Sequence, residues 1–420
     1  MRRIARTKFG AFLCLCVLVL IANEVNLQPI PGKVILRLRY RGETSELKKN
    51  PYTIGIFERE VEDPAEYIGA LMGTDWDGCI YIFDPIKPDL WVLKRFDRQG
   101  KFQEEWNPIR ARYGENVAVT KDGYVWLGIR WVDSDRLRGF PLVAYQKGKK
   151  APIIDWRREL PKHVKDVRDK VSAEIGVDWE KIWEERKESY VHPRDVFVYR
   201  LDCGPSRVGI SLHATFLGAE NYLARFLWIL CSSDGKEIFE AHIGTRVPFL
   251  GFDGNIWIKE IERLKDIWSS WKKIWLFKRG EDKGESLIDL EKRQPEWINK
   301  VIFGEAEKVY GPIINIDAKG NIYVIFERGF SLERQRIKIQ VEGKYRYVLA
   351  PTIGGAEGAL VVLDKHRRFL THLPWTLTYL EYPNWQHWIK PLPDGSGFYR
   401  IEFREREAVI YFHPLPSQKP

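Results

Sequence analysis

One short pattern recurs along this chain: a tight turn containing Gly, usually with Asp, and then a strand with Ile or Val before Tyr or Trp. It occurs at residues 75–82, 120–127, 251–258 and 317–324, and in a degenerate form at 393–399. Asp, Asn and Gly tolerate the positive φ that tight hairpin turns need, and alternating β-branched and aromatic residues suit half-buried strands. The recurrence predicts a repeat protein built from β-hairpins.

A second hairpin follows most copies, with an apolar strand before a basic turn, as at residues 92–101, 142–149, 226–236, 274–280 and 360–367. Two hairpins give four strands, and four-stranded units repeated radially are the blades of a β-propeller. The sequence therefore predicts an all-β fold with six blades. Their expected bounds are about 66–108, 114–156, 192–244, 246–290, 309–373 and 385–413.

The turns at Asp317–Val324 and Phe96–Gly100 carry the closest likeness to a known family. They resemble the blade turns of six-bladed propellers of the NHL-repeat type, and the resemblance covers roughly residues 66–413. It implies an architecture that binding proteins, scaffolds and enzymes share, and it implies no particular activity.

The last blade supplies three strands, near residues 388–392, 398–403 and 408–413. The segment Lys33–Tyr40 alternates apolar and basic residues and lies outside every other blade. We expect it to complete blade six and close the ring, which removes the exposed strand edges. The alternative is an independent hairpin with residues 52–57. The propeller then spans residues 33–414, followed by a short tail at 415–420.

The N-terminus carries four basic residues before an apolar stretch at residues 9–22, too short for the roughly 20 residues that span a bilayer. Residues 1–22 are therefore expected to be a signal peptide or membrane anchor. The protein would then be periplasmic, extracellular or anchored at the outer side of the cytoplasmic membrane. Charged residues make up 30% of the chain and Met is scarce, which is typical of proteins adapted to heat.

The net charge of +9 includes those four N-terminal residues, and no basic stripe interleaved with aromatics follows. We therefore expect no nucleic-acid partner. No nucleotide-binding, zinc-binding or calcium-binding motif occurs, so no cofactor or metal is expected. Beyond residue 22, Cys79, Cys203 and Cys231 remain. A disulfide, if one forms, would join Cys203 and Cys231, which share blade three.

In a propeller, the turns between strands one and two and between strands three and four lie on one face, and the other connections lie on the opposite face. The expected long insertions all belong to the second set: residues 83–90, 132–139, 157–190, 218–223, 262–272, 291–308, 329–357 and 374–384. Such one-sided elaboration predicts a binding or catalytic surface. Apolar spacing predicts that the insertion at 157–190, between blades two and three, is helical.

Aromatic residues gather at the last insertion, with a histidine among them: Tyr379, Tyr382, Trp385, His387 and Trp388. Flat rings beside polar groups can stack on sugars, so these residues are the candidate ligand-binding site. The alternative is that the rings pack between blades.

Candidate acid–base residues on the same face are Asp133, Asp135, His192, Glu220, Glu327, Glu357, Glu381 and His387. Their spacing does not show which of them converge. Two functions stay open: non-catalytic binding of a glycan or protein partner, and a carbohydrate-active or lactone-hydrolysing enzyme at the same channel mouth.

Overall fold

The computed structural model describes most of the strands and a few residues of the insertion after blade two. The described residues are 31–42, 50–56, 71–87, 90–111, 113–130, 142–156, 162, 165, 166, 169, 170, 173, 197–217, 222–244, 248–263, 271–289, 308–329, 331–354, 357–376 and 389–416.

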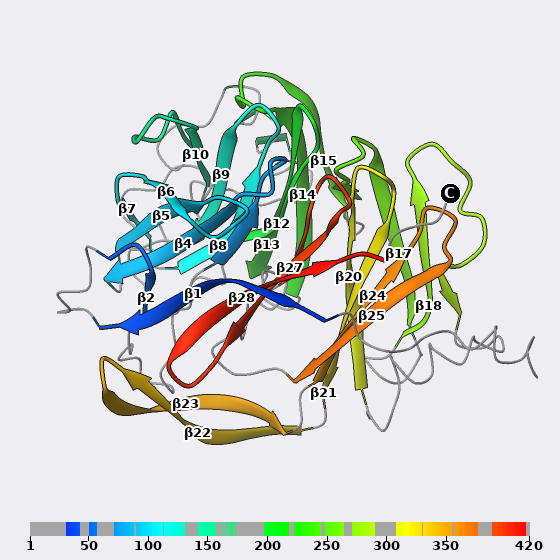
Figure 1. Ribbon diagram of the computed structural model, residues 1–420. Helices are drawn as coiled ribbons and strands as arrows, with labels where there is room; N and C mark the ends of the chain where they lie inside the picture. The colour runs from blue at the N-terminus through cyan, green and yellow to red at the C-terminus, as the bar shows by residue number, and fades with distance from the viewer. Residues whose placement is uncertain are drawn as a thin grey trace, which may run out of the picture.

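The described chain forms six sheets and one separate hairpin, which together make the predicted six-bladed β-propeller (Figure 1). Blade one contains β3 (Leu71–Thr74), β4 (Ile80–Lys87), β5 (Leu90–Phe96), β6 (Phe102–Glu105) and β7 (Ile109–Arg110). Blade two contains β8 (Tyr113–Val119), β9 (Tyr124–Arg130), β10 (Leu142–Gln146) and β11 (Ile154–Asp155). Blade three contains β12 (Phe197–Cys203), β13 (Arg207–Leu217), β14 (Tyr222–Ser232) and β15 (Ile238–Gly244).

The remaining blades follow the same order. Blade four contains β16 (Pro248–Leu250), β17 (Ile256–Arg263), β18 (Trp271–Lys278) and β19 (Ile288–Asp289). Blade five contains β20 (Lys308–Ile316), β21 (Ile322–Gly329), β24 (Glu357–Leu363) and β25 (Phe369–Thr376). Blade six contains β26 (Ile389–Pro391), β27 (Gly397–Phe403), β28 (Glu407–Pro414), β1 (Lys33–Arg41) and β2 (Thr53–Gly55). The first strands of consecutive blades contact one another, as in β3 with β8 and β8 with β12, so these strands surround the axis.

In blades one and five, the first Asp of the repeated turn holds the turn together. In blade five, Oδ1 of Asp317 accepts hydrogen bonds from the backbone N–H groups of Lys319 (2.8 Å) and Asn321 (2.9 Å). Its Oδ2 accepts a hydrogen bond from the Tyr323 hydroxyl at 3.0 Å. Gly320 takes a φ of 83°, which favours glycine. The Asp, the Gly and the following Tyr are therefore parts of one buried hydrogen-bonded turn.

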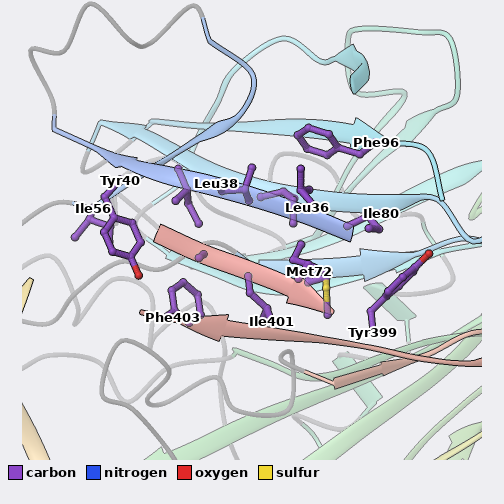
Figure 2. Packing of buried hydrophobic residues seen from close by; sticks show 14 of the residues in the cluster. Leu36, Leu38, Tyr40, Ile56, Met72, Ile80, Phe96, Tyr399, Ile401 and Phe403 are labelled. Carbon is purple, nitrogen blue, oxygen red and sulfur yellow. The ribbon is translucent and has the colours of Figure 1, made fainter. Parts of the chain in front are cut away.

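The N-terminal strand closes the ring, as the sequence predicts. β1 pairs antiparallel with β28, with Arg37 opposite Val409, and its other edge pairs in parallel with β2, with Tyr40 opposite Ile54. The alternative of an independent hairpin is wrong, because β1 is shared with the last blade. Figure 2 shows the apolar cluster beneath this closure, which joins side chains of β1 to those of blades six and one, including Leu36, Leu38, Met72, Ile80, Ile401 and Phe403.

A buried ionic cluster ties the end of β1 to blade one. Asp84 Oδ2 lies 2.7 Å from Arg41 Nη2 and 2.6 Å from Lys94 Nζ, and all three side chains are fully or almost fully buried. Asp84 Oδ1 accepts the backbone N–H of Gly55 at 2.8 Å. A buried charge is tolerated only when it is paired in this way, so the cluster fixes how β1 and β2 meet blade one.

Blade five carries an inserted hairpin, β22 (Ser331–Val341) and β23 (Lys344–Gly354), between β21 and β24. Its tip reaches the closure: Val341 is 2% exposed and belongs to the same apolar cluster as Leu36. Glu342 Oε1 accepts the backbone N–H of Gly42 at 3.2 Å. In Figure 1 this hairpin runs beneath blade six from blade five towards β1. It therefore links blade five to the closing strand.

Several expectations need correction. Cys79, Cys203 and Cys231 are buried free thiols, so no disulfide forms among them and the pairing considered for Cys203 and Cys231 does not occur. Its two strands, β12 and β14, are separated by β13. The expected insertion at 83–90 is also wrong, because β4 extends to Lys87 and β5 begins at Leu90. Of the expected insertion at 218–223, residues 218–221 lie outside the described residues, so it stays a prediction.

The helix predicted at 157–190 lies largely outside the described residues and stays a prediction. The few described positions within it, such as Lys165 and Asp166, have helical backbone and are exposed. Within the described ranges, no helix has the length and apolar character needed to cross a membrane.

Candidate functional site

The predicted aromatic site lies outside the described residues, as do most of the candidate acid–base residues. This applies to Tyr379, Tyr382, Trp385, His387 and Trp388, and to Asp133, Asp135, His192, Glu220 and Glu381. The flanking strands define where the aromatic segment connects: β25 ends at Thr376 and β26 begins at Ile389. It therefore links the outer strand of blade five to the inner strand of blade six.

Two of the predicted carboxylates belong to described strands of blade five. Glu327 in β21 lies opposite Gly358, and Glu357 in β24 lies opposite Arg328. Glu327 and Glu357 therefore belong to neighbouring residue pairs along the two strands, and they are not directly opposite each other. It gives no indication of a catalytic carboxylate pair here.

The inner strands bring a different set of side chains together around the axis. In each blade, a turn follows the inner strand. The first residue of that turn donates its backbone N–H to a carbonyl oxygen at the far end of the turn; these first residues are Asp75, Thr120, Gly204, Gly251, Asp317 and Leu392. The residues two positions earlier therefore lie at one level of the axis: Gly73, Ala118, Asp202, Phe249, Asn315 and Lys390. Blades one, two and four contribute small or apolar residues to this level, whereas blades three, five and six contribute polar ones.

Arg200 connects blade three to blade five past blade four. Its Nε lies 2.7 and 2.8 Å from the two carboxylate oxygens of Asp202. Its Nη2 donates to the carbonyl oxygen of Ile314 at 2.7 Å and to Oδ1 of Asn315 at 3.1 Å. Blade four lies between these two blades in the ring. The guanidinium therefore passes over the inner strand of blade four, and it lies 4.1 Å from the ring centroid of Phe249 in that blade.

Lys390 adds a second cation to this axial cluster from blade six, opposite blade three in the ring. Burial lowers the pKa of Lys390 to about 8, and the negative charge of Asp202 partly opposes this shift. Burial also raises the pKa of Asp202, although Arg200 and the backbone N–H of Leu250 stabilise its carboxylate. The two groups therefore interact across the axis, and both charged forms are disfavoured by burial.

An aromatic pair spans the axis on the turn side of this cluster. Trp76 from the first turn of blade one meets Phe252 from the corresponding turn of blade four, edge to face, with ring centroids 5.8 Å apart. Lys121 Nζ lies 5.5 Å from the Trp76 ring centroid. Since blades one and four are opposite each other, the rings cover this end of the axis, so a ligand would reach the axial cluster from the other end.

The axial cluster consists of Arg200, Asp202, Asn315 and Lys390, and it offers charged and neutral hydrogen-bonding groups to a polar ligand. Across the described parts of the chain, no group of three His, Cys, Asp or Glu side chains could hold a metal ion. Sequence analysis missed the cluster because blade three lacks the Asp-Gly turn that marks inner strands elsewhere. Comparing the residues two positions before each first turn would have found Asp202, Asn315 and Lys390 but not Arg200.

The connections of the ring are one-sided, as predicted. On the face that carries the turns within each hairpin, here called the turn face, the longest connection is Arg279–Leu287. On the opposite face, here called the loop face, the chain runs from Asp155 to Phe197, from Asp289 to Lys308 and from Thr376 to Ile389 between strands. The blade-five hairpin is inserted on this face too. The more elaborate face is therefore the one opposite the pair of Trp76 and Phe252.

Comparison with known proteins gives neither a family nor an activity. No family model matches the sequence, and no curated protein matches it. Among solved structures, the chain is similar to a member of the DUF4221 family from Bacteroides vulgatus, with 9% identity, a TM-score of 0.41, and coverage of 94% of this chain and 100% of that chain. It is also similar to oligogalacturonate lyase in complex with manganese, with 9% identity, a TM-score of 0.36, and coverage of 92% and 99%. A third similar structure is the β-propeller domain of the Trilobed protease from Pyrococcus furiosus, which has an open velcro topology, with 9% identity, a TM-score of 0.36, and coverage of 81% and 95%.

Proposed function

We propose that this protein is an exported, non-catalytic β-propeller that binds a glycan or protein partner through its loop face. The observation that carries the proposal is the one-sided elaboration of the ring. Stability alone does not require long connections to gather on one face, whereas a binding surface held on a rigid scaffold does.

The axial cluster supports the same face. Arg200, Asp202, Asn315 and Lys390 offer donors and acceptors at the centre of the ring, and the pair of Trp76 and Phe252 covers the opposite end. A ligand that lies over the loop face can therefore reach polar groups on the axis while it contacts the surrounding connections.

The segment between β25 and β26 supplies the aromatic part of the proposal. It leads directly into the inner strand that carries Lys390. Tyr379, Tyr382, Trp385 and Trp388 would stack on sugar rings or on side chains of a partner, and His387 would donate a hydrogen bond to a hydroxyl group.

Export and NHL-type blades belong to the same proposal. Export is supported by the basic residues that precede the apolar stretch at 9–22. The NHL type is supported by the Asp, Gly and Tyr positions of the blade-five turn, whose hydrogen bonds account for the repeat.

A glycan array and a screen of exported-protein libraries with the purified full chain test the proposal. Trp385→Ala should abolish or weaken the binding that is found, whereas Phe239→Ala should not, because Phe239 is 48% exposed on the outer strand of blade three. Equal losses in the two variants, or no ligand in either screen, would count against the loop face as the binding surface.

An enzyme is the second candidate, and the axial cluster is the observation that favours it. Burial raises the pKa of Asp202 and lowers that of Lys390, and perturbed pKa values are common at catalytic sites. Release of reducing ends from polysaccharides, or hydrolysis of lactones, that is lost in Lys390→Met while the ligand still binds would support this alternative.

A further inference from the structure

The N-terminal strand enters the ring on the turn face. β1 begins at Lys33, which pairs with Phe412 near the end of β28. That end of β28 lies beside the first turn of blade six, where the backbone N–H of Leu415 donates to the carbonyl oxygen of Ser396 at 3.0 Å. The chain before Lys33 therefore leaves from the turn face at blade six, on the side opposite the loop face.

Exposed lysines flank this exit. On one side, blades one and two contribute Lys101, Lys121, Lys149 and Lys150. On the other side, blade five contributes Lys319 and Lys365. In the described part of the chain, none of these six side chains forms an ion pair. Blades five, one and two surround blade six on both sides, so the turn face has a basic sector centred on the point where the chain leaves.

The acidic residues of these turns do not neutralise the basic sector at its surface. Asp97 Oδ1 accepts the backbone N–H groups of Gln99 and Lys101, each at 2.9 Å. Asp364 Oδ1 accepts those of His366 (2.8 Å) and Arg368 (2.9 Å), and Asp317 is fully buried. Their carboxylates face the backbone, while the six lysine side chains are exposed.

Exposed acids on the turn face gather elsewhere. Glu281, Asp282 and Glu285 belong to the outer turn of blade four. Within the basic sector, Asp122 and Asp77 are exposed, and Asp77 lies 3.5 Å from Lys147. The turn face thus has a basic sector around blade six, whereas the outer turn of blade four carries both signs, because Arg279 and Lys283 are exposed beside its acids.

We propose that the basic sector of the turn face binds the headgroups of anionic lipids, so that the ring lies on a membrane with its loop face directed away from the bilayer. Lysines near an anionic bilayer contribute independently and cumulatively to binding. The basic sector is a feature of the structure, whereas the choice of a membrane as its partner rests on the proposed export. If residues 9–22 remain in the bilayer, residues 23–32 can extend about 35 Å at most, which keeps the turn face near the surface.

Vesicle co-sedimentation of the full chain tests this contact. Vesicles of phosphatidylcholine with phosphatidylglycerol are compared with vesicles of phosphatidylcholine alone, at low and at high salt. The wild-type chain should prefer the anionic vesicles, and salt should reduce this preference. Lys149→Glu/Lys365→Glu should lose about tenfold or more of the preference. Lys344→Glu/Arg406→Glu, which makes the same charge change at exposed positions of the loop face, should retain it.

Other outcomes overturn the proposal. These are no preference for anionic vesicles, equal losses in the two double variants, and a preference that disappears when residues 1–22 are removed, since the basic N-terminus would then be its source. Tighter binding of duplex DNA than of anionic vesicles would assign the sector to nucleic acid instead. Glycan or protein binding by the loop face should be unchanged in Lys149→Glu/Lys365→Glu, so failure of the lipid contact is distinguishable from failure of the proposed function.

Discussion

The backbone N–H of Gln340 donates to the carbonyl oxygen of Glu405 at 2.8 Å, which joins the tip of the blade-five hairpin to the turn between β27 and β28. The next residue, Val341, is buried in the closure cluster, and the residue after it accepts the backbone N–H of Gly42. The hairpin of β22 and β23, here called the strap, therefore joins blade five to blade six and to the end of the closing strand β1.

Placing a charge at the tip of the strap should weaken the closure. Val341→Asp would bury an unpaired carboxylate in the apolar cluster and should lower the free energy of unfolding by about 3 kcal/mol or more. Urea unfolding measures this. Lys344→Asp, at an exposed position three residues later, should change the free energy by less than about 0.5 kcal/mol. Similar values for the two variants would show that the strap does not stabilise the ring.

Removal of the closing strand should have a much larger effect than removal of the N-terminal segment. A chain without residues 1–22 should unfold at the temperature of the full chain. A chain without residues 1–41 loses β1 and exposes the edge of β28, so it should unfold at a lower temperature or aggregate. Differential scanning calorimetry compares the two. Equal unfolding temperatures would contradict the closure.

The capping Asp of blade five should be important for stability. Asp317→Ala leaves the backbone N–H groups of Lys319 and Asn321 and the Tyr323 hydroxyl without their acceptor, so we expect a loss of about 2–4 kcal/mol. The control is Asp122→Ala, because Asp122 is exposed and Thr120 Oγ1 accepts the turn N–H in blade two. Chemical unfolding of both variants should separate them, and indistinguishable stabilities would refute the account of the turn.

The axial lysine should make stability depend on pH in the alkaline range. The pKa of Lys390 is about 8 in the folded protein, and that of an unfolded lysine is about 10.4. Between these values the unfolded chain binds more protons, so the contribution of Lys390 to the free energy of unfolding rises with pH. The wild-type protein should therefore gain stability relative to Lys390→Met from pH 8 towards pH 10. Parallel stability curves would exclude a buried, titrating Lys390.

Trp385 distinguishes a binding platform from packing between blades. If its ring binds a ligand, Trp385→Ala should weaken binding by about 1–3 kcal/mol and leave the unfolding midpoint unchanged. If the ring is core, the same change should cost about 3–5 kcal/mol of stability. Titration calorimetry with a ligand found by screening, together with thermal unfolding of the same variant, gives both numbers. A large loss of stability would remove the platform.

Local chemistry made the architecture predictable. The Gly of each turn and the Tyr or Trp that follows are short-range features, and in blade five the hydrogen bonds of Asp317 show that one turn contains the Asp, the Gly and the Tyr. The closing strand was predictable too, because blade six lacked a strand and Lys33–Tyr40 had the alternation of one.

The axial cluster was not predictable in the same way. Arg200 and Asn315 are 115 positions apart and meet only because the ring places blades three and five on either side of blade four. The strap was missed for a similar reason: residues 329–357 were assigned to a connection, and nothing local to Val341 shows that it packs against blade six. Both features depend on the ring being assembled.

Closure by the first strand also affects when the chain can fold. Arg37 and Glu407 form an ion pair across 370 positions, so the ring cannot close until almost the whole chain is available. Pairing between residues so far apart in the sequence is slow. In a chain that crosses a membrane from its N-terminus, β1 would emerge long before β28, the strand with which it pairs. If the protein is exported as proposed, the late arrival of β28 would keep the chain unfolded during translocation and delay closure of the ring until its last blade has crossed.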